Sequence, residues 1–204
     1  MKGTTARPTY HHGDLRNALI AAGAKLAEHA GPQAVGVRAA ARAVGVTPTA
    51  AYRHFANADE LRTAVKERAF DALAEAMRAE VAKLPPTADA ANDALQRTYA
   101  IGRAYVGVAL AEPGLFRTAF GQPHGDNAAA REEDASFSML RDAADDLVAT
   151  GLLPSERRPM AEFAAWSAVH GLAMLILDGP LSDQTEQAQE AILRRTLDMV
   201  ARGL

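Results

Sequence analysis

Apolar residues recur along the chain at the three-and-four spacing of amphipathic helices, and no stretch alternates as a half-buried strand would. Gly-Pro, Pro-Pro and Gly-Val steps separate these segments. The pattern therefore predicts an all-α protein of about nine helices. We expect three short helices near 15–30, 37–44 and 48–54, a connecting helix over 58–83, and further helices near 89–111, 114–120, 128–149, 156–178 and 185–202.

The third helix is unusually polar. It follows the Gly45-Val46 turn, reads TPTAAYRHF over 47–55, and offers only Ala51 and Phe55 as core anchors beside Val46. Two short helices joined by such a turn are typical of a helix-turn-helix, whose last helix enters the DNA major groove. The prediction is a DNA-facing surface in which Thr49, Ala50 and Arg53 point toward base edges, Thr47, Tyr52 and His54 flank them at phosphates, and Pro48 and Arg38 complete the set.

Charge separates the N-terminal part of the chain from the rest. Residues 1–68 hold ten Lys or Arg against five Asp or Glu, a charge of +5, whereas residues 69–204 hold twelve against twenty, a charge of −8. A basic head can attract phosphates, and an acidic body is repelled by them. Further cations of the head that can add to this attraction are Lys2, Arg7, Arg16 and Arg42.

Composition gives the broad class of protein. The 204 residues are 49% hydrophobic and 23% charged, values that are ordinary for a globular protein. No cysteine is present, which excludes disulfides and thiolate metal sites. The N-terminal residues have no apolar signal core, and the most apolar run, LAMLIL at 172–177, is far shorter than a membrane span. We therefore expect a soluble cytoplasmic protein.

The run GVTPTAAYRHFANADEL, residues 45–61, resembles the DNA-binding signature of the TetR family of transcriptional regulators. The resemblance extends over about residues 10–70. It implies phosphate contacts for Thr47, Tyr52 and His54, base-edge positions for Thr49 and Ala50, and a core position for Phe55. The opening YHHGDLR, residues 10–16, is similar to a subset of the family, and is either a basic arm with His11 and His12 near phosphate or a plain tail.

Two positions depart from the family pattern. The family usually has lysine where this chain has Ala58, and serine or threonine where it has Gly36. Both departures remove a side chain that the resemblance would place near phosphate. They bear on DNA affinity and leave the expected fold unchanged.

The segment 164–177 is apolar nearly all the way round, apart from Ser167 and His170. A helix without a polar face has to be covered on more than one side, most simply by the same helix of a second subunit. We therefore predict a homodimer in which this helix and the last one form a four-helix interface. The residues expected there are Ala164, Ala168, Gly171, Leu172, Leu175, Ile192, Thr196 and Met199.

The segment AWSAVHGLAMLILDG, residues 165–179, resembles part of the C-terminal domain of the TetR subgroup named for its Trp-His-Gly signature. Trp166 and His170 share a helix face because they are four residues apart. They are either packed core residues or one wall of an effector pocket, in which a single polar group orients an apolar ligand. The predicted pocket residues are Tyr99, Tyr105, Phe116, Phe120, Phe137, Met139, Trp166 and His170.

An enzyme and a helical scaffold are the competing classes. Ser167, His170 and Asp178 lie on one straight helix and cannot form a Ser-His-Asp relay. A scaffold that binds only proteins or small molecules would not need the outward polar set of 47–54. We expect no catalytic residue, cofactor or metal site.

The resulting hypothesis is a transcriptional regulator with a DNA-binding head over 1–57, a connector over 58–84, and an effector-binding and dimerisation body over 85–204. It would act as a homodimeric repressor that a small apolar or amphipathic molecule releases from a palindromic operator. Activation instead of repression stays open.

Overall fold

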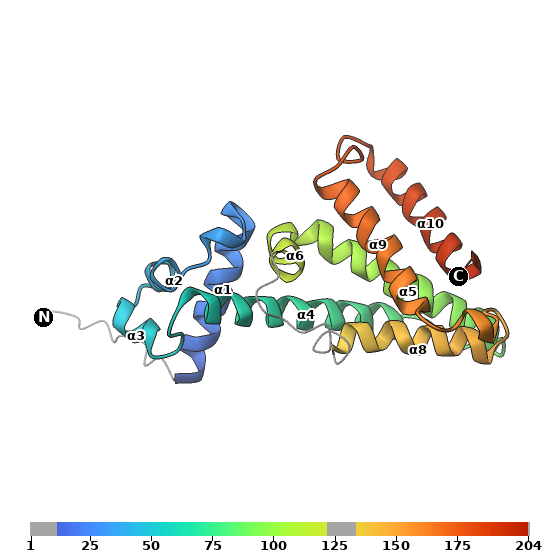
Figure 1. Ribbon diagram of the computed structural model, residues 1–204, viewed down its shortest axis with the longest axis horizontal. Coiled ribbons are helices and arrows are strands. Elements are labelled where there is room, and N and C mark those ends of the chain that lie inside the picture. The colour runs from blue at the N-terminus through green and yellow to red at the C-terminus, as the bar shows by residue number, and fades with distance from the viewer. Residues whose placement is uncertain (1–11, 122–133, 204) are drawn as a thin grey trace, which may run out of the picture.

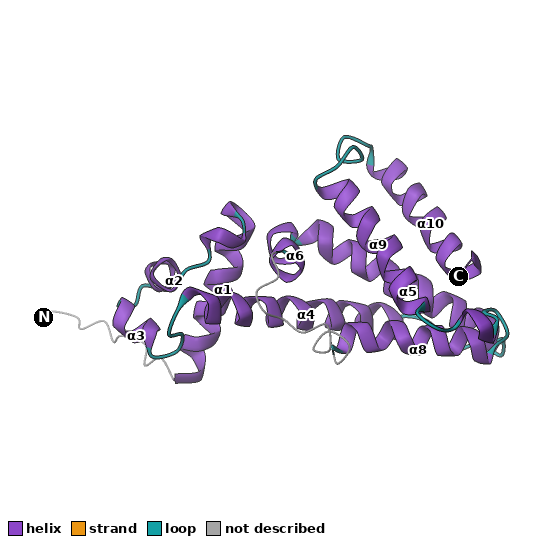
Figure 2. Ribbon diagram, in the orientation of Figure 1, coloured by secondary structure: helices purple, strands orange, loops and turns teal. Residues whose placement is uncertain are grey.

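The computed structural model describes residues 12–121 and 134–203. Within them the chain forms nine α-helices and no strand, which confirms the all-α prediction (Figure 2). The basic arm and most of the loop predicted at 121–127 lie outside the described residues. The helices are α1 His12–Ala30, α2 Val37–Val44, α3 Pro48–Tyr52, α4 Ala58–Ala82, α5 Ala90–Ala111, α6 Pro113–Phe120, α8 Ala135–Ala149, α9 Ala161–Leu177 and α10 Glu186–Gly203, with short 3-10 turns at Pro32–Ala34 and Ser155–Arg157.

The molecule is elongated, with helices α1, α2 and α3 at one end (Figure 1). The helices α5, α8, α9 and α10 gather at the other end, and α4 runs along the molecule between the two groups. None of the helices in the described part of the chain combines the length and the apolar character that crossing a bilayer requires.

Helix α4 contributes to two hydrophobic cores. Its first half places Leu61 and Val65 in the core of the head, together with residues of α1, α2 and α3. Its second half places Leu73 and Met77 in the core of the body, together with residues of α5, α9 and α10. The head core therefore extends past residue 57, as far as Ala69 of α4.

The start of α4 is fixed by two reciprocal hydrogen bonds between side chain and backbone. The side chain of Asn57 accepts a hydrogen bond from the backbone N–H of Glu60 at 2.9 Å. The Glu60 carboxylate accepts in return from the backbone N–H of Ala56 at 2.7 Å, one residue before the cap itself. Both bonds satisfy backbone donors that a helix start leaves open.

Helix α6 contacts both the head and the body. At its first turn Gly114 meets α1 so closely that an added Cβ would lie 1.9 Å from Cα of Glu28. One turn later Arg117 donates two hydrogen bonds to Asp178 after α9, at 3.0 Å and 2.5 Å. These bonds hold the pKa of the Asp178 carboxyl below its usual range. The short α6 is thus tied to the end of α1 and to the end of α9.

Helix α9 begins five residues later than the predicted start at 156. Residues Ser155–Arg157 form a 3-10 turn, and Pro159 has no N–H with which to continue a helical hydrogen-bond series. Met160 then adopts a left-handed conformation, with φ of 64°, directly before the first helical residue. The sequence pattern missed this break because the residues around it are compatible with a helix.

Candidate DNA interface and effector cavity

The turn between α2 and α3 requires a glycine. Gly45 has φ of 78°, in the left-handed region that residues with a Cβ avoid. Its conformation ends α2 and lets the N–H of Val46 bond to the carbonyl of Ala41 at 3.0 Å. The Thr47 side chain then accepts a hydrogen bond from the N–H of Ala50 at 3.3 Å and caps α3. The turn and the cap together set the direction of α3.

Two buried residues hold α3 against the head. Ala51 and Phe55 are almost fully buried in the head core, as their spacing predicted, while Val46 is half-buried against it. The guanidinium of Arg16 in α1 lies 5.2 Å from the centre of the Phe55 ring and covers it. The short helix is therefore attached by one of its faces, and its other faces remain at the surface.

The predicted DNA-facing residues all reach the surface of the head. Six are exposed and two are half-buried, and they come from the starts of α2 and α3 and from the turn after α3. The exposed residues are Arg38, Thr47, Pro48, Thr49, Tyr52 and Arg53, and the half-buried ones are Ala50 and His54.

The two departures from the TetR pattern lie at helix starts. Gly36 is the cap of α2, and it offers no side chain to the open N–H groups of that helix. Ala58 is the first residue of α4, directly after the capping Asn57. The nearby cation Arg62 does not replace a lysine there, because it is hydrogen-bonded to Asp59 and to the carbonyl of Val35.

The residues predicted for a dimer interface divide into a surface strip and a core position. Helical spacing puts Ala164, Ala168, Gly171 and Leu175 on one face of α9, and all four are exposed or half-buried. Leu172 lies instead in the core of its own body. On α10 the spacing aligns Ile192, Thr196 and Met199, of which Met199 is 58% exposed. We name the seven surface residues the α9–α10 strip.

Five of the eight predicted pocket residues pack on one another. Phe120 lies 4.8 Å from both Phe116 and His170 between ring centres. Trp166 donates its Nε1–H to Oη of Tyr105 at 2.9 Å, and the same oxygen lies 2.8 Å from Nδ1 of His170. This aromatic cluster (Tyr105, Phe116, Phe120, Trp166 and His170) fills the space between α5, α6 and α9.

The other three predicted pocket residues lie apart from this cluster or at its edge. Tyr99 donates its hydroxyl proton to Asp198 of α10 at 2.5 Å, and burial together with this bond raises the pKa of Tyr99. Phe137 lies 4.9 Å from Phe163, at the edge of the aromatic cluster beside Trp166. Met139 is half-buried against the body core.

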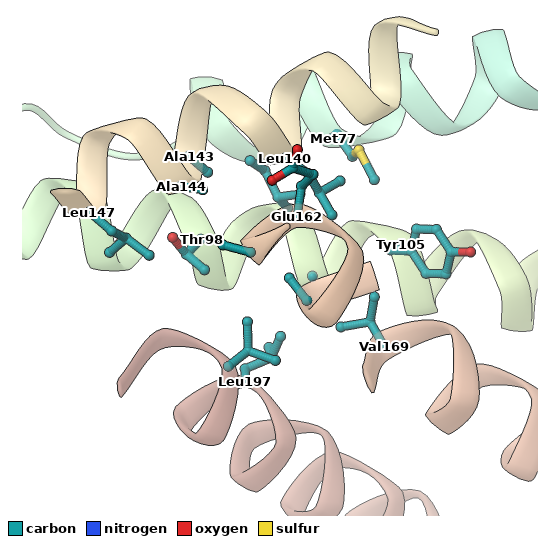
Figure 3. Close-up of a pocket in the computed structure, with 15 residues that line it drawn as sticks. Met77, Thr98, Tyr105, Leu140, Ala143, Ala144, Leu147, Glu162, Val169 and Leu197 are labelled. Atoms are coloured by element: carbon teal, nitrogen blue, oxygen red, sulfur yellow. The ribbon is translucent and has the colours of Figure 1, made fainter. Parts of the chain in front are cut away.

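A small cavity lies on the other side of Tyr105, between α4, α5, α8, α9 and α10 (Figure 3). Its volume is about 40 Å³, which is room for about one water molecule. Of the eight predicted pocket residues only Tyr105 lines it, and Figure 3 shows its hydroxyl pointing away. The other lining residues are Met77, Thr98, Ile101, Gly102, Leu140, Ala143, Ala144, Leu147, Ala161, Glu162, Ala165, Val169, Leu197 and Val200.

Glu162 is the charged residue of this wall, and sequence reasoning missed it. It belongs to the first turn of α9, is 9% exposed, and accepts a hydrogen bond from Arg158 at 2.8 Å. Arg158 also donates to Asp145 of α8 at 2.5 Å. A signal was present in the sequence, because Glu162 is followed at helical spacing by Ala165 and Val169, which are apolar and line the same cavity.

Comparison with known proteins assigns both parts of the chain to one family. Residues 98–200 match the family model described as Tetracyclin repressor-like, C-terminal domain, and residues 19–65 match Bacterial regulatory proteins, tetR family. No curated protein matches the chain.

Solved structures match nearly the whole chain. One is a protein of unknown function from Rhodococcus sp. RHA1, with 26% identity, a TM-score of 0.79, and coverage of 97% of this chain and 99% of that one. The TetR family transcriptional regulator PfmR from Thermus thermophilus has 21% identity, a TM-score of 0.61, and coverage of 91% and 98%. A transcriptional regulator from Rhodococcus sp. RHA1 has 19% identity, a TM-score of 0.57, and coverage of 92% and 96%. The last two matches establish similarity of fold.

The family models together cover the helix-turn-helix head and the greater part of the helical body. The chain therefore belongs to the TetR family of bacterial regulatory proteins, and it is a DNA-binding transcription regulator and not an enzyme.

Proposed function

We propose that this regulator is a homodimeric repressor of the cytoplasm that a small apolar or amphipathic molecule releases from a palindromic operator. The observation that carries the proposal is the surface of α3, where Thr49, Tyr52 and Arg53 stand exposed on a helix that Ala51 and Phe55 attach to the head core. Exposed polar and small side chains on one helix are suited to partners on DNA.

Within this surface we assign two kinds of contact. Thr49, Ala50 and Arg53 meet base edges, because small groups let the backbone approach and arginine pairs with guanine. The phosphate contacts belong to the residues on either side, Thr47, Pro48, Tyr52 and His54, with Arg38 supplying attraction from α2. The hydroxyl of Thr47 already accepts from the N–H of Ala50 and still has its proton to donate to a phosphate oxygen.

The dimer is supported by the α9–α10 strip. A two-fold axis through it would place the same surface of two subunits against each other. Two heads would then present two α3 helices, which have to lie ~34–36 Å apart to read adjacent half-sites. We also assign the body to the Trp-His-Gly subgroup, on the positions of Trp166, His170 and Gly171 in α9.

Release by a ligand is supported by the way α4 and α6 connect the body to the head. α4 belongs to both cores, and α6 is tied to α1 by Gly114 and to α9 by Arg117. A ligand that binds the body better in one arrangement of these helices shifts the separation of the two heads. The differential affinity for the two arrangements sets the extent of release.

Binding to DNA upstream of the protein's own gene, or to a palindrome selected from a random pool, tests the proposal. We expect Arg53→Ala to lower the binding free energy by ~1–3 kcal/mol and to relax the sequence preference at one base position. Tyr52→Phe removes the hydroxyl assigned to a phosphate, and it should lower the affinity for all DNA sequences alike. Arg103→Ala, an exposed arginine of α5, is the matched control. A wild-type protein that binds neither DNA contradicts the proposal.

Restoring the family lysine should strengthen DNA binding without changing its specificity. The variant Ala58→Lys adds a cation at the start of α4, and we expect every sequence to bind more tightly and the salt slope to steepen by about 1. Titrations at several salt concentrations measure this slope. Gln187→Lys, which adds the same charge at an exposed position of α10, should leave it unchanged. An equal slope for both variants would place Ala58 away from phosphate.

A further inference from the structure

We propose that DNA binding by this regulator is sensitive to pH, and that His170 is the group whose protonation weakens it. His170 belongs to a chain of hydrogen bonds between α5 and α9. Trp166 donates its Nε1–H to Oη of Tyr105 at 2.9 Å, and the same oxygen lies 2.8 Å from Nδ1 of His170. We name these three residues the hydrogen-bond trio. The inference rests on the proposed dimer and is independent of the proposed release by a ligand.

The donors and acceptors of the trio fit a neutral His170. An indole N–H only donates, so the Tyr105 oxygen accepts from Trp166. The proton of the Tyr105 hydroxyl is used within the trio only by the histidine tautomer whose Nδ1 carries no proton and accepts it. An imidazolium has a proton on both nitrogens, so Trp166 and His170 would then direct two donors at one oxygen. Protonation of His170 therefore breaks the trio.

The surroundings of the ring are mostly aromatic. Helix α6 faces His170 with Phe116 and Phe120, whose ring centres lie 5.6 Å and 4.8 Å from that of the imidazole. The charged groups beside these rings are Arg117 on α6 and Asp178 after α9, and they are bonded to each other. A protonated His170 thus gains no carboxylate from them. Because the ring is half-buried, it reaches water by turning away from Tyr105.

Helix α6 connects a change at His170 to the head. Its residues Leu115 and Ala119 are buried in the head core, whereas Phe116 is buried in the body core. At Gly114 the helix meets the backbone of α1 too closely for any side chain, so α6 has to move together with α1. His170 packs on the side of α6 that faces the body. Turning its ring away removes packing that holds α6, and with it the head, against α9.

Acid should therefore weaken DNA binding. A looser contact between α6 and α9 widens the range of head positions, so fewer dimers hold both α3 helices at the spacing of one operator. The loss of one hydrogen bond corresponds to about a two- to tenfold change in such an equilibrium. Histidines near phosphate act in the opposite direction, because their protonation adds attraction. The effect of His170 is for this reason measured as a ratio between two proteins at the same pH.

The protonation of His170 is followed through Trp166, the only tryptophan of the chain. The two ring centres are 5.7 Å apart, and an imidazolium in contact quenches indole fluorescence more strongly than a neutral imidazole does. We expect a fluorescence step between about pH 8 and pH 5 in the wild type. His170→Asn keeps an acceptor near the position of Nδ1 that does not titrate, and should lack the step. His29→Asn makes the same change at an exposed residue of α1 and should retain it.

The palindrome is then titrated at two pH values and constant salt. From about pH 8 to about pH 5.5 we expect the affinity of the wild type to fall relative to that of His170→Asn by at least about threefold. His29→Asn should behave as the wild type. Tyr105→Phe retains the histidine but removes the trio, so it should keep the fluorescence step and follow His170→Asn in DNA binding. Thermal unfolding at both pH values verifies that the variants fold.

Three outcomes would overturn the inference. The first is a fluorescence step that persists in His170→Asn, since another group would then titrate beside Trp166. The second is a ratio of DNA affinities between the wild type and His170→Asn that is the same at both pH values. The third is a Tyr105→Phe protein whose DNA affinity depends on pH as that of the wild type does.

Sedimentation at the same two pH values separates the inference from the proposed dimer. We expect the wild type to be dimeric at both, because His170 is not part of the α9–α10 strip. A protein that is monomeric at both pH values contradicts the proposed dimer, and the fluorescence step and the affinity ratio still decide the role of His170.

Discussion

Arginine introduced at both Leu175 and Met199 should leave the protein folded but monomeric, and should weaken binding to a palindromic operator by about 10²–10⁴-fold. Leu175 is 44% exposed and Met199 is 58% exposed, so neither side chain supports its own core. In a two-fold dimer each new guanidinium would be buried against an apolar surface or a second cation. Burying an unpaired charge destabilises the dimer relative to the monomer. Two unlinked heads would then read their half-sites independently and lose the gain from simultaneous binding.

Sedimentation at micromolar concentration gives the mass, and a titration of the palindrome gives the affinity. The control carries arginine at Leu110 and Leu152, two exposed leucines outside α9 and α10, and adds the same charge. It should remain dimeric and bind DNA as the wild type does. A dimeric Leu175→Arg, Met199→Arg protein would show that the interface lies elsewhere.

Gly114→Ala should destabilise the protein by about 1–3 kcal/mol. The new Cβ would lie 1.9 Å from Cα and 2.3 Å from N of Glu28, and 2.6 Å from the carbonyl oxygen of Ala27. All three are backbone atoms of α1, so no side-chain rotation relieves the overlap. The whole of α6 has to move away from α1, and contacts of the head with the body are lost.

Urea unfolding measures this change, with Gly107→Ala as the matched control. Gly107 is an exposed residue of α5 with no atom within 4 Å of an added Cβ. Alanine there should stabilise the helix by about 0.5–1 kcal/mol. If both substitutions shift the unfolding midpoint in the same direction, the close approach of α6 to α1 does not exist in solution.

The head could be predicted from the sequence because its pattern is local. The Gly45-Val46 turn, the Thr47 cap and the four-residue spacing of Ala51 and Phe55 each depend on neighbours in the chain. The start of α9 was predicted at 156, three residues before Pro159, because a proline is tolerated in the first turn of a helix. Tertiary packing and the left-handed Met160 decide for the later start.

The cavity could not be predicted because its walls come from helices distant in the sequence. From the sequence Trp166 and His170 could be packed core residues or a pocket wall with the other aromatic residues, and rings attract one another in edge-on and tilted pairs. Five of the eight therefore pack into a cluster, and smaller aliphatic side chains leave the open space. Glu162 was missed because a glutamate on a helix is usually a surface residue, whereas in the fold it is buried and bonded to Arg158.

Because α4 belongs to both cores, it determines where the head of one regulator can be joined to the body of another. Leu61, Val65 and Ala69 complete the core beneath the DNA-reading surface, although they follow the helix-turn-helix in the sequence. A hybrid protein joined at residue 57 would combine this head with foreign residues at all three positions. A junction after Ala69 would transfer the head with its own supporting half-helix and leave Leu73 and Met77 to the recipient body. The transferable unit is therefore longer than the DNA-reading motif by about three helical turns.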